Sequence, residues 1–195
     1  MSETGVVKFQ CDHLEREPAP FASFDELNAT RHALVRRGLI GVDAHGVGFG
    51  NLSVRDGATK QFFITGSGTG GLSELGLRNY AKVTAYDFAR NWLRCEGRMI
   101  ASAESLTHAA VYEADPTASA ILHVHSHDLW KRGRKILPTT TEAIEYGTPA
   151  MAAEVRRLFA ETDVRERRIF VMAGHADGVV VFGKNLAEAL ALIAA

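Results

Sequence analysis

The sequence predicts a single α/β domain with a central sheet that is mixed or mostly antiparallel. The chain has 195 residues, which suits one domain with a sizeable buried core. Hydrophobic residues make up 46% and charged residues 23% of it, an ordinary globular composition. Short apolar, β-branched runs are interleaved with segments of helical periodicity, an order typical of α/β proteins.

Four segments carry the signals of α-helices. Ser23 and Glu26 have the spacing of a capping box, and the periodic segment after them ends near Gly38. A second helix has Ser102 as a candidate N-cap and is stopped by Pro116, because proline cannot continue a helix. The four predicted helices lie within residues 23–40, 102–116, 148–163 and 185–195.

Apolar or alternating runs bounded by glycine and polar residues predict the strands. The predicted strands cover residues 52–55, 61–65, 83–87, 92–95, 120–125, 167–175 and 177–183. The last two close a hairpin-like unit around Asp177 and Gly178. Residues 1–20 end in the turn-like EPAP and are predicted to be an irregular N-terminal arm, with the domain spanning residues 21–195.

Charge and cysteine content exclude several classes of protein. A formal net charge of −1 gives no reason to expect nucleic acid or an anionic membrane as a partner. Cys11 and Cys95 are too few for a disulfide framework and are expected to be free thiols in a reducing compartment, the cytoplasm. No run of about 18 apolar residues is present, so no transmembrane helix is expected.

Three histidines alternate in the stretch ILHVHSHDLW, residues 121–130. Alternate side chains share one face of a strand, so His123 and His125 would place two imidazoles close together, as a transition metal requires. The best candidate for a third ligand is His175, at the end of a strand before a glycine-rich turn. A solvated strand edge with incidental histidines is the alternative. His127 is the weaker ligand candidate, because the chain leaves the strand for a loop after Ser126.

Glu104 lies at the start of the helix that leads into the His-x-His strand, with His108 one turn further on. A carboxylate beside a metal can be a ligand or can move protons on a polarised substrate. The alternative is an acid that is favoured there only by the helix dipole.

Two glycine-rich segments, residues 49–55 and 64–71, flank predicted strands. Their backbone N–H groups and hydroxyls could cradle an anion such as a phosphate or carboxylate. Neither is a Walker A loop or a dinucleotide fingerprint, so a flexible turn remains the alternative for each.

Five motifs in order give a specific resemblance: GNLSVR, FFITGSGTG, SAESLTHAAVYEADPTASAILHVHS, GTPAMAAEV and GHADGVVVFG. From about residue 26 to the C-terminus, the chain resembles the class II aldolase/adducin family. The resemblance implies an α/β/α sandwich, a homotetramer, and a divalent metal, zinc or alternatively manganese, iron or cobalt. It implies that His123, His125 and His175 hold the metal and that Glu104 is the catalytic acid/base.

The same resemblance implies an anion site. In phosphate-handling members it uses residues that match Asn51, Thr65, Gly66 and Ser102. Ala103 stands where those members have a second serine, so a phosphorylated substrate stays open. Tyr146 is not expected to replace the catalytic tyrosine that the sugar-phosphate aldolases take from a longer loop.

The expected function is a metal-dependent lyase that cleaves or forms a C–C bond in a hydroxy-carbonyl substrate, a sugar or sugar phosphate, through a metal-stabilised enediolate. A sugar-phosphate epimerase or dehydratase, or a hydroxy-acid decarboxylase, is the alternative on the same site. A non-catalytic interaction domain, as in adducin, is the alternative of another class.

Overall fold

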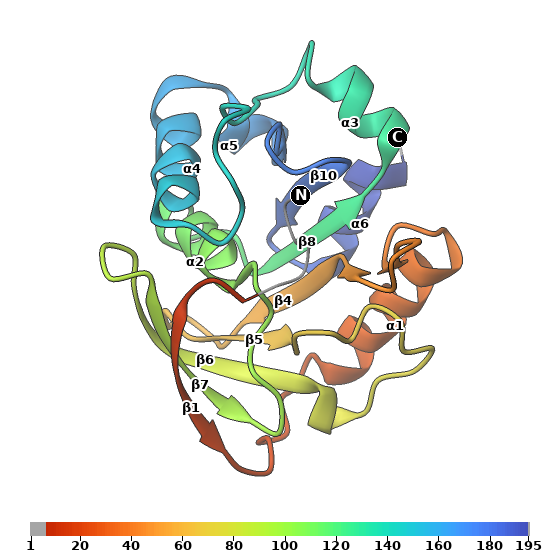
Figure 1. Cartoon of the computed structure of the whole chain (residues 1–195), viewed down its shortest axis with the longest axis vertical. Helices are drawn as coiled ribbons and strands as arrows, with labels where there is room; N and C mark the ends of the chain where they lie inside the picture. The colour runs from red at the N-terminus through yellow and green to blue at the C-terminus, as the bar shows by residue number, and fades with distance from the viewer. Residues whose placement is uncertain (1–6, 195) are drawn as a thin grey trace.

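Eight strands form one mixed sheet through the centre of the molecule (Figure 1). The structure, a computed structural model, describes residues 7–194. The strand order is β1-β7-β6-β5-β4-β8-β10-β9, and every neighbouring pair except β1–β7 is antiparallel. The strands are β1 (Gln10–Glu15), β4 (Asn51–Arg55), β5 (Phe62–Thr65), β6 (Tyr80–Asp87), β7 (Trp92–Gly97), β8 (Ala120–His125), β9 (Ile169–Val171) and β10 (Gly178–Gly183). A separate two-stranded hairpin consists of β2 (Gly41–Val42) and β3 (Gly48–Phe49).

Helices cover both faces of the sheet. The helices are α1 (Phe24–Arg36), α2 (Ser105–Ala114), α3 (His127–Gly133), α4 (Pro149–Glu161), α5 (Val164–Arg167) and α6 (Leu186–Ala194), with a 3₁₀ turn at Leu77–Asn79. Apolar residues of α2, α4 and α5 form one buried cluster with one face of the sheet, and those of α1 and α6 form a second cluster with the other face. Figure 1 shows α2, α4 and α5 on one side of β8, and α1 and α6 on the other. The predicted single-domain α/β/α sandwich with a mostly antiparallel sheet is therefore confirmed.

Strand β8 illustrates how the sequence specifies the layers. Its side chains alternate, so Ile121 belongs to the cluster under α2 and α4, whereas Leu122 and Val124 belong to the cluster under α1 and α6. His123 and His125 continue the row of Ile121. The two histidines therefore emerge on the α2 side, at the end of a strand that is paired on both edges.

One predicted N-cap is wrong, and the other is in place but lacks its predicted hydrogen bond. Ser23 is the residue before α1, but its side chain makes no capping hydrogen bond, since its backbone is near φ −89° and ψ 11° rather than extended. Ser102 does not cap α2 but lies two residues before its N-cap, where its N–H donates to Thr65 O at the end of β5, at 3.2 Å. Helix α2 begins three residues later, with Glu104 in the N-cap position.

Strand β1 and helix α3 were missed, as were the short elements β2, β3, α5 and the 3₁₀ turn. The irregular arm predicted for residues 1–20 contains β1, which pairs in parallel with β7 at the edge of the sheet. Residues 1–6 of that arm lie outside the described residues, and the domain boundary at residue 21 stays a prediction. The loop predicted after Ser126 is helix α3, whose Leu129 N–H donates to the Ser126 hydroxyl at 3.4 Å. Neither QCDHLE nor HDLWKRG has enough periodicity to be recognised without its tertiary contacts.

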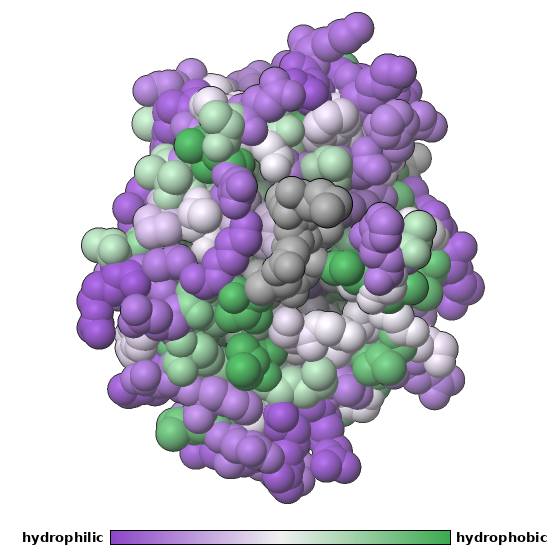
Figure 2. Space-filling model, viewed as in Figure 1, coloured by the Kyte–Doolittle hydropathy of each residue, from purple (hydrophilic) through white to green (hydrophobic). Residues whose placement is uncertain are grey.

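The face shown in Figure 2 has no continuous apolar band. Hydrophilic residues surround separate apolar patches around the grey atoms (Figure 2). Among the described residues, none of the helices combines the length and apolar character needed to cross a bilayer. The cytoplasmic location stays a prediction.

Candidate metal-binding active site

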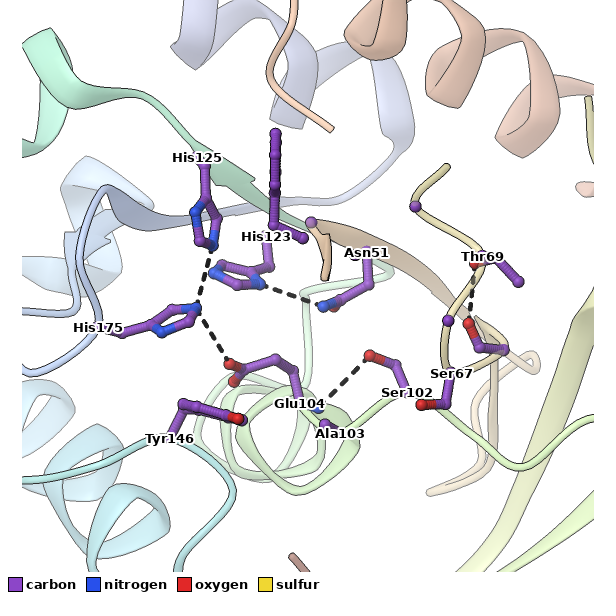
Figure 3. A pocket seen from close by; sticks show the side chains of 16 residues that line it. Asn51, Ser67, Thr69, Ser102, Ala103, Glu104, His123, His125, Tyr146 and His175 are labelled. Carbon is purple, nitrogen blue, oxygen red and sulfur yellow. Dashed lines mark hydrogen bonds and ion pairs between the residues drawn. The ribbon is translucent and has the colours of Figure 1, made fainter. Parts of the chain in front are cut away.

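Three imidazoles converge at the end of β8. One ring nitrogen from each of His123, His125 and His175 lies within 4.8 Å of the other two. The Nε2 atoms of His125 and His175 are 3.0 Å apart, and Figure 3 shows the three rings facing a common point. Such a cluster can hold a divalent transition metal.

The turn between β9 and β10 brings His175 to this point. Gly178 pairs with His125 in the register of β10 and β8, so the chain before Gly178 passes beside the end of β8. A Cβ atom on Gly178 would lie 2.6 Å from Cδ2 of His175, so only glycine leaves room for this ring. The turn is closed by the N–H of Gly178, which donates to His175 O at 2.9 Å.

The three imidazoles are held in their neutral form, which is the form that binds metals. Burial lowers the pKa of His175 to about 3 and that of His125 to about 4. Burial, with the two neighbouring imidazoles, holds the pKa of His123 well below its usual value. Nε2 of His123 is buried and has no hydrogen-bond partner among the described residues. These donors fit a divalent metal, because each offers a lone pair without competition from a proton.

Asn51 supports the His123 ring from the neighbouring strand. The β4–β8 register places Asn51 opposite His123, and the Asn51 amide lies 3.1 Å from Nδ1 of the ring. A His123 that binds metal through Nε2 carries its proton on Nδ1 and needs an acceptor there. Rotation of the Asn51 amide supplies that acceptor, since Oδ1 is buried and without a partner in the described part of the chain.

We therefore expect Asn51→Ala to weaken metal binding by about 10–100-fold, as loss of a hydrogen bond to a ligating histidine does elsewhere. Titration of the chelator-stripped protein with zinc or cobalt measures the effect. Asn51→Asp, which keeps an acceptor oxygen, is the matched control and should retain most of the affinity. Equal affinities of Asn51→Ala and the wild type would contradict the role given to Asn51.

Glu104 faces the imidazole cluster from the start of α2. Its Oε1 atom lies 3.7 Å from Nε2 of His175, and Oε2 accepts a hydrogen bond from the Thr107 hydroxyl at 2.9 Å. Only 3% of Glu104 is exposed, and Oε1 has no hydrogen-bond partner among the described residues. Burial raises the pKa of Glu104 to about 7, although the Thr107 hydroxyl and the charge of Lys8 oppose the shift. A carboxyl group with a pKa near neutrality can both take and return a proton.

The other two histidines of interest do not join the cluster. His127 is exposed at the start of α3, and its Nδ1 pairs with Asp177 at 2.9 Å. His108 is fully buried within the layer of α2, where its Nδ1 and the Ser53 hydroxyl form a hydrogen bond of 2.7 Å. The Ser53 hydroxyl is also 2.8 Å from the hydroxyl of Tyr112, so these three residues form a polar network inside the core.

The glycine-rich loop closes the other side of the same pocket. Asn51, Gly66 and Ser102 line the pocket together with Glu104 and the three clustered histidines. Thr65 does not line it, since its hydroxyl is turned inward and accepts from the N–H of Leu52 at 3.3 Å. Within the glycine-rich segment 64–71, the structure places Ser67, Gly68, Thr69 and Gly70 in the pocket wall, and it adds Tyr146, which sequence reasoning did not assign to the site.

Tyr146 was set aside on sequence grounds but lies in the pocket wall. It is only 2% exposed, and its ring centroid is 4.7 Å from that of His175. A Cβ atom on Gly174 would lie 2.2 Å from Ile144 O, so Gly174 lets the loop that carries Tyr146 pack against the turn just before His175. Packing between segments distant in sequence thus brings Tyr146 to the site. The one sequence signal for this close packing was Gly174, next to the predicted metal ligand His175.

Comparison with solved structures identifies similar folds. L-fuculose 1-phosphate aldolase superposes with a TM-score of 0.69 at 22% identity, over 91% of this chain and 82% of that one. YgbL from Klebsiella pneumoniae, provisionally described as an aldolase/epimerase/decarboxylase, gives 0.65 at 24% identity, over 87% and 82%. A sugar-phosphate aldolase from Thermotoga maritima gives 0.62 at 17% identity, over 88% and 89%.

The sequence itself has a family match over most of its length. Comparison with curated proteins gives no match. The model of the class II aldolase and adducin N-terminal domain matches residues 26–195, which include all the residues of the pocket. The chain therefore belongs to the class II aldolase/adducin family.

Proposed function

We propose that the protein is a metal-dependent lyase of the class II aldolase type, which cleaves or forms a C–C bond in a hydroxy-carbonyl substrate. The observation that carries the proposal is the meeting of three neutral imidazoles with a buried carboxyl group of near-neutral pKa in one pocket. Zinc is the metal we propose, with manganese, iron or cobalt as alternatives, because imidazole suits all four.

His123, His125 and His175 would hold the metal. When bound there, a divalent ion supplies Lewis acidity to a carbonyl and an adjacent hydroxyl oxygen. Glu104 then moves the proton. When the C–C bond breaks, the departing fragment gives its hydroxyl proton to solvent water and leaves as an aldehyde, and the other fragment keeps the electron pair as an enediolate. The protonated Glu104 delivers its proton to the carbon of the enediolate, and in the synthetic direction the carboxylate removes it.

The pocket wall opposite the histidines would fix the other end of the substrate. We propose that a phosphate or carboxylate group lies against Asn51, Gly66 and Ser102. The Asn51 amide and the Ser102 hydroxyl would donate to it, and Thr65 would support the loop from below. Holding both ends places the reacting carbon beside Glu104, and such positioning is a large part of the rate enhancement in reactions of this kind.

Other reactions could use the same residues. Epimerisation, dehydration and decarboxylation also proceed through an enediolate or a related carbanion, and the name given to YgbL covers two of these. A non-catalytic domain like that of adducin is the alternative of another class. The complete set of three histidines and Glu104 favours an enzyme over such a domain. We propose a homotetramer on the basis of family membership alone.

Metal analysis and a substrate panel test the proposal. We expect the purified protein to bind about one divalent ion per chain and to release aldehyde from a ketose phosphate or a hydroxy acid, with the activity lost on chelation and restored by metal. Inversion at a carbon without cleavage would establish the epimerase instead. A protein that takes up no metal on titration would contradict the enzyme and favour the interaction domain.

A further inference from the structure

Arg31 on α1 is a buried cation without a counter-charge. Its side chain is 1% exposed, and the hydrogen bonds that it makes among the described residues all go to backbone carbonyls. Its Nη1 is shielded from solvent and donates to no acceptor in the described part of the chain. Burial lowers the pKa of Arg31, but a guanidinium remains protonated in proteins. An unpaired buried charge of this kind is costly, so it calls for an explanation.

The carbonyls that Arg31 binds all belong to the glycine-rich loop that lines the pocket. Nη2 donates to Thr69 O at 2.8 Å and to Leu72 O at 2.7 Å, with Gly70 O at 3.4 Å. The loop is confined from the other side as well, because a Cβ atom on Gly70 would lie 2.2 Å from the backbone oxygen of Gly41 in the β2–β3 hairpin. The loop is therefore held between the guanidinium and the hairpin.

In this arrangement the backbone N–H groups of the loop differ in whether they have a partner. The N–H groups of Gly66 and Ser67 are used within the protein, by Asn79 O and Ile100 O. Those of Gly68, Thr69 and Gly70 donate to no acceptor among the residues that the structure describes, although all three residues line the pocket. The carbonyl oxygens of Thr69 and Gly70 thus accept from the Arg31 guanidinium, while the N–H groups of this stretch have no acceptor among the described residues. Consecutive free N–H groups form an anion site, and a cation behind them strengthens it.

We propose that Arg31 is a positioning residue for an anionic group of the substrate: from behind the loop, it fixes the carbonyls of Thr69, Gly70 and Leu72 and leaves the loop N–H groups for the anion. The inference rests on the proposed function in that the anion belongs to the substrate of the same pocket. It identifies the substrate as one with a terminal phosphate or carboxylate. The buried positive charge is balanced when that anion is bound, which explains why none of the acidic residues that the structure describes pairs with Arg31.

Inorganic phosphate and acetate are suitable probes, since their binding requires neither turnover nor an identified substrate. We expect calorimetric titration of the metal-loaded wild type, at constant ionic strength, to show binding of one of the two anions. Phosphate binding would indicate a phosphorylated substrate, and acetate binding a carboxylate. We expect Arg31→Met to weaken that binding at least about tenfold, and Arg31→Lys to weaken it less, because an ammonium keeps the charge but loses the planar fork.

Arg37 provides the matched control. It follows the same helix, and its Nη2 also donates to a backbone carbonyl, that of Ile193 at 3.0 Å, but it does not touch the loop. Arg37→Met removes the same charge from the same region and should leave anion binding within about twofold of the wild type, as expected of a partly screened charge away from the site. If Arg31→Met does not fold, the anion affinities of Arg31→Lys and Arg31→Gln test the inference instead.

A kinetic measurement separates positioning from structural damage. Once a substrate is known, Arg31→Lys should raise its KM and change kcat little, and it should not raise the KM of an uncharged analogue. Absence of binding of either anion to the wild type, or equal binding by folded Arg31 variants, would overturn the inference. Anion binding that depends on Arg31 in a protein without lyase activity would support the anion site and contradict only the proposed function.

Discussion

Replacing Glu104 by glutamine is expected to reduce the rate of C–C cleavage by about 10²–10⁴-fold, the range typical of a lost general acid/base. The amide cannot take up or deliver the proton at the reacting carbon. It has nearly the same shape as the carboxyl group, and its oxygen can still accept from the Thr107 hydroxyl, so the site should keep its structure. The three imidazoles are unchanged, so metal affinity should stay within a few-fold of the wild type. Steady-state kinetics of the metal-loaded variant, with a metal titration, measure both quantities.

Glu113 gives the control for this substitution. It lies on the same helix α2, but near the surface, where it pairs with Lys60 and Arg156. Glu113→Gln removes the same charge from the same element and should leave cleavage near the wild-type rate, because surface ion pairs contribute little. A Glu104→Gln variant that cleaves at the wild-type rate would exclude Glu104 as the proton carrier.

The metal-free protein is expected to unfold as the pH falls from 6.5 towards 4. Burial lowers the pKa of four histidines, to about 3 for His108 and His175, to about 4 for His125, and well below its usual value for His123. The unfolded chain takes up protons below pH 6.5 that the folded chain excludes, so each histidine reduces the free energy of unfolding as the pH falls through this window. A pKa difference of two units corresponds to about 2.7 kcal/mol, so His108, His125 and His175 together reduce the free energy of unfolding by about 8 kcal/mol, and His123 acts in the same direction. This loss is comparable with the ~5–15 kcal/mol that typically stabilises a domain.

Glu104 acts in the opposite sense. Its pKa in the folded state is raised to about 7, so the stability present below its ordinary pKa of 4.5 is lost as the pH rises towards 7. One carboxyl group changes the free energy of unfolding less than four histidines do, so the loss of stability at low pH should dominate the profile. Denaturant melts of the chelator-treated protein at a series of pH values measure the effect. His127→Gln, a change at an exposed residue, should leave the profile unaltered, and a metal-free protein equally stable at pH 6.5 and pH 4 would contradict the prediction.

The parts of the fold that could be predicted from the sequence are those with a local signal. Strand β8 was predicted with its bounds, because a continuous apolar run ends in alternating histidines. Strand β1 and helix α3 depend on partners distant in sequence. The first pairs with β7, and the second is fixed by Trp130 Nε1, which donates to Met172 O at 2.9 Å. A window of neighbouring residues contains neither interaction.

The candidate site likewise has residues that a local sequence signal indicates and residues that depend on tertiary contacts. Alternation alone predicted that His123 and His125 share a face. The predicted strand end and helix start made His175 and Glu104 candidates, and the family resemblance gave them their roles. The glycine-rich motif indicated a loop that could bind an anion, but that Ser67–Gly70 and Tyr146 form one wall depends on how loops distant in sequence pack together. Arg31 is the extreme case, since an arginine in an amphipathic helix predicts a solvent-exposed side chain and here it is buried beneath a loop.

The three imidazoles differ in how firmly the backbone holds them. Strand β8 pairs with both β4 and β10 at His123, and with β10 alone at His125. The backbones of these two histidines can therefore open only with the centre of the sheet. His175 sits in a turn closed by short-range hydrogen bonds, and local opening there is much less costly. Two of the three candidate ligands are therefore held rigidly by the sheet, whereas His175 can move with its turn. Binding and release of an ion would proceed through movement of the His175 turn, without unfolding of the domain.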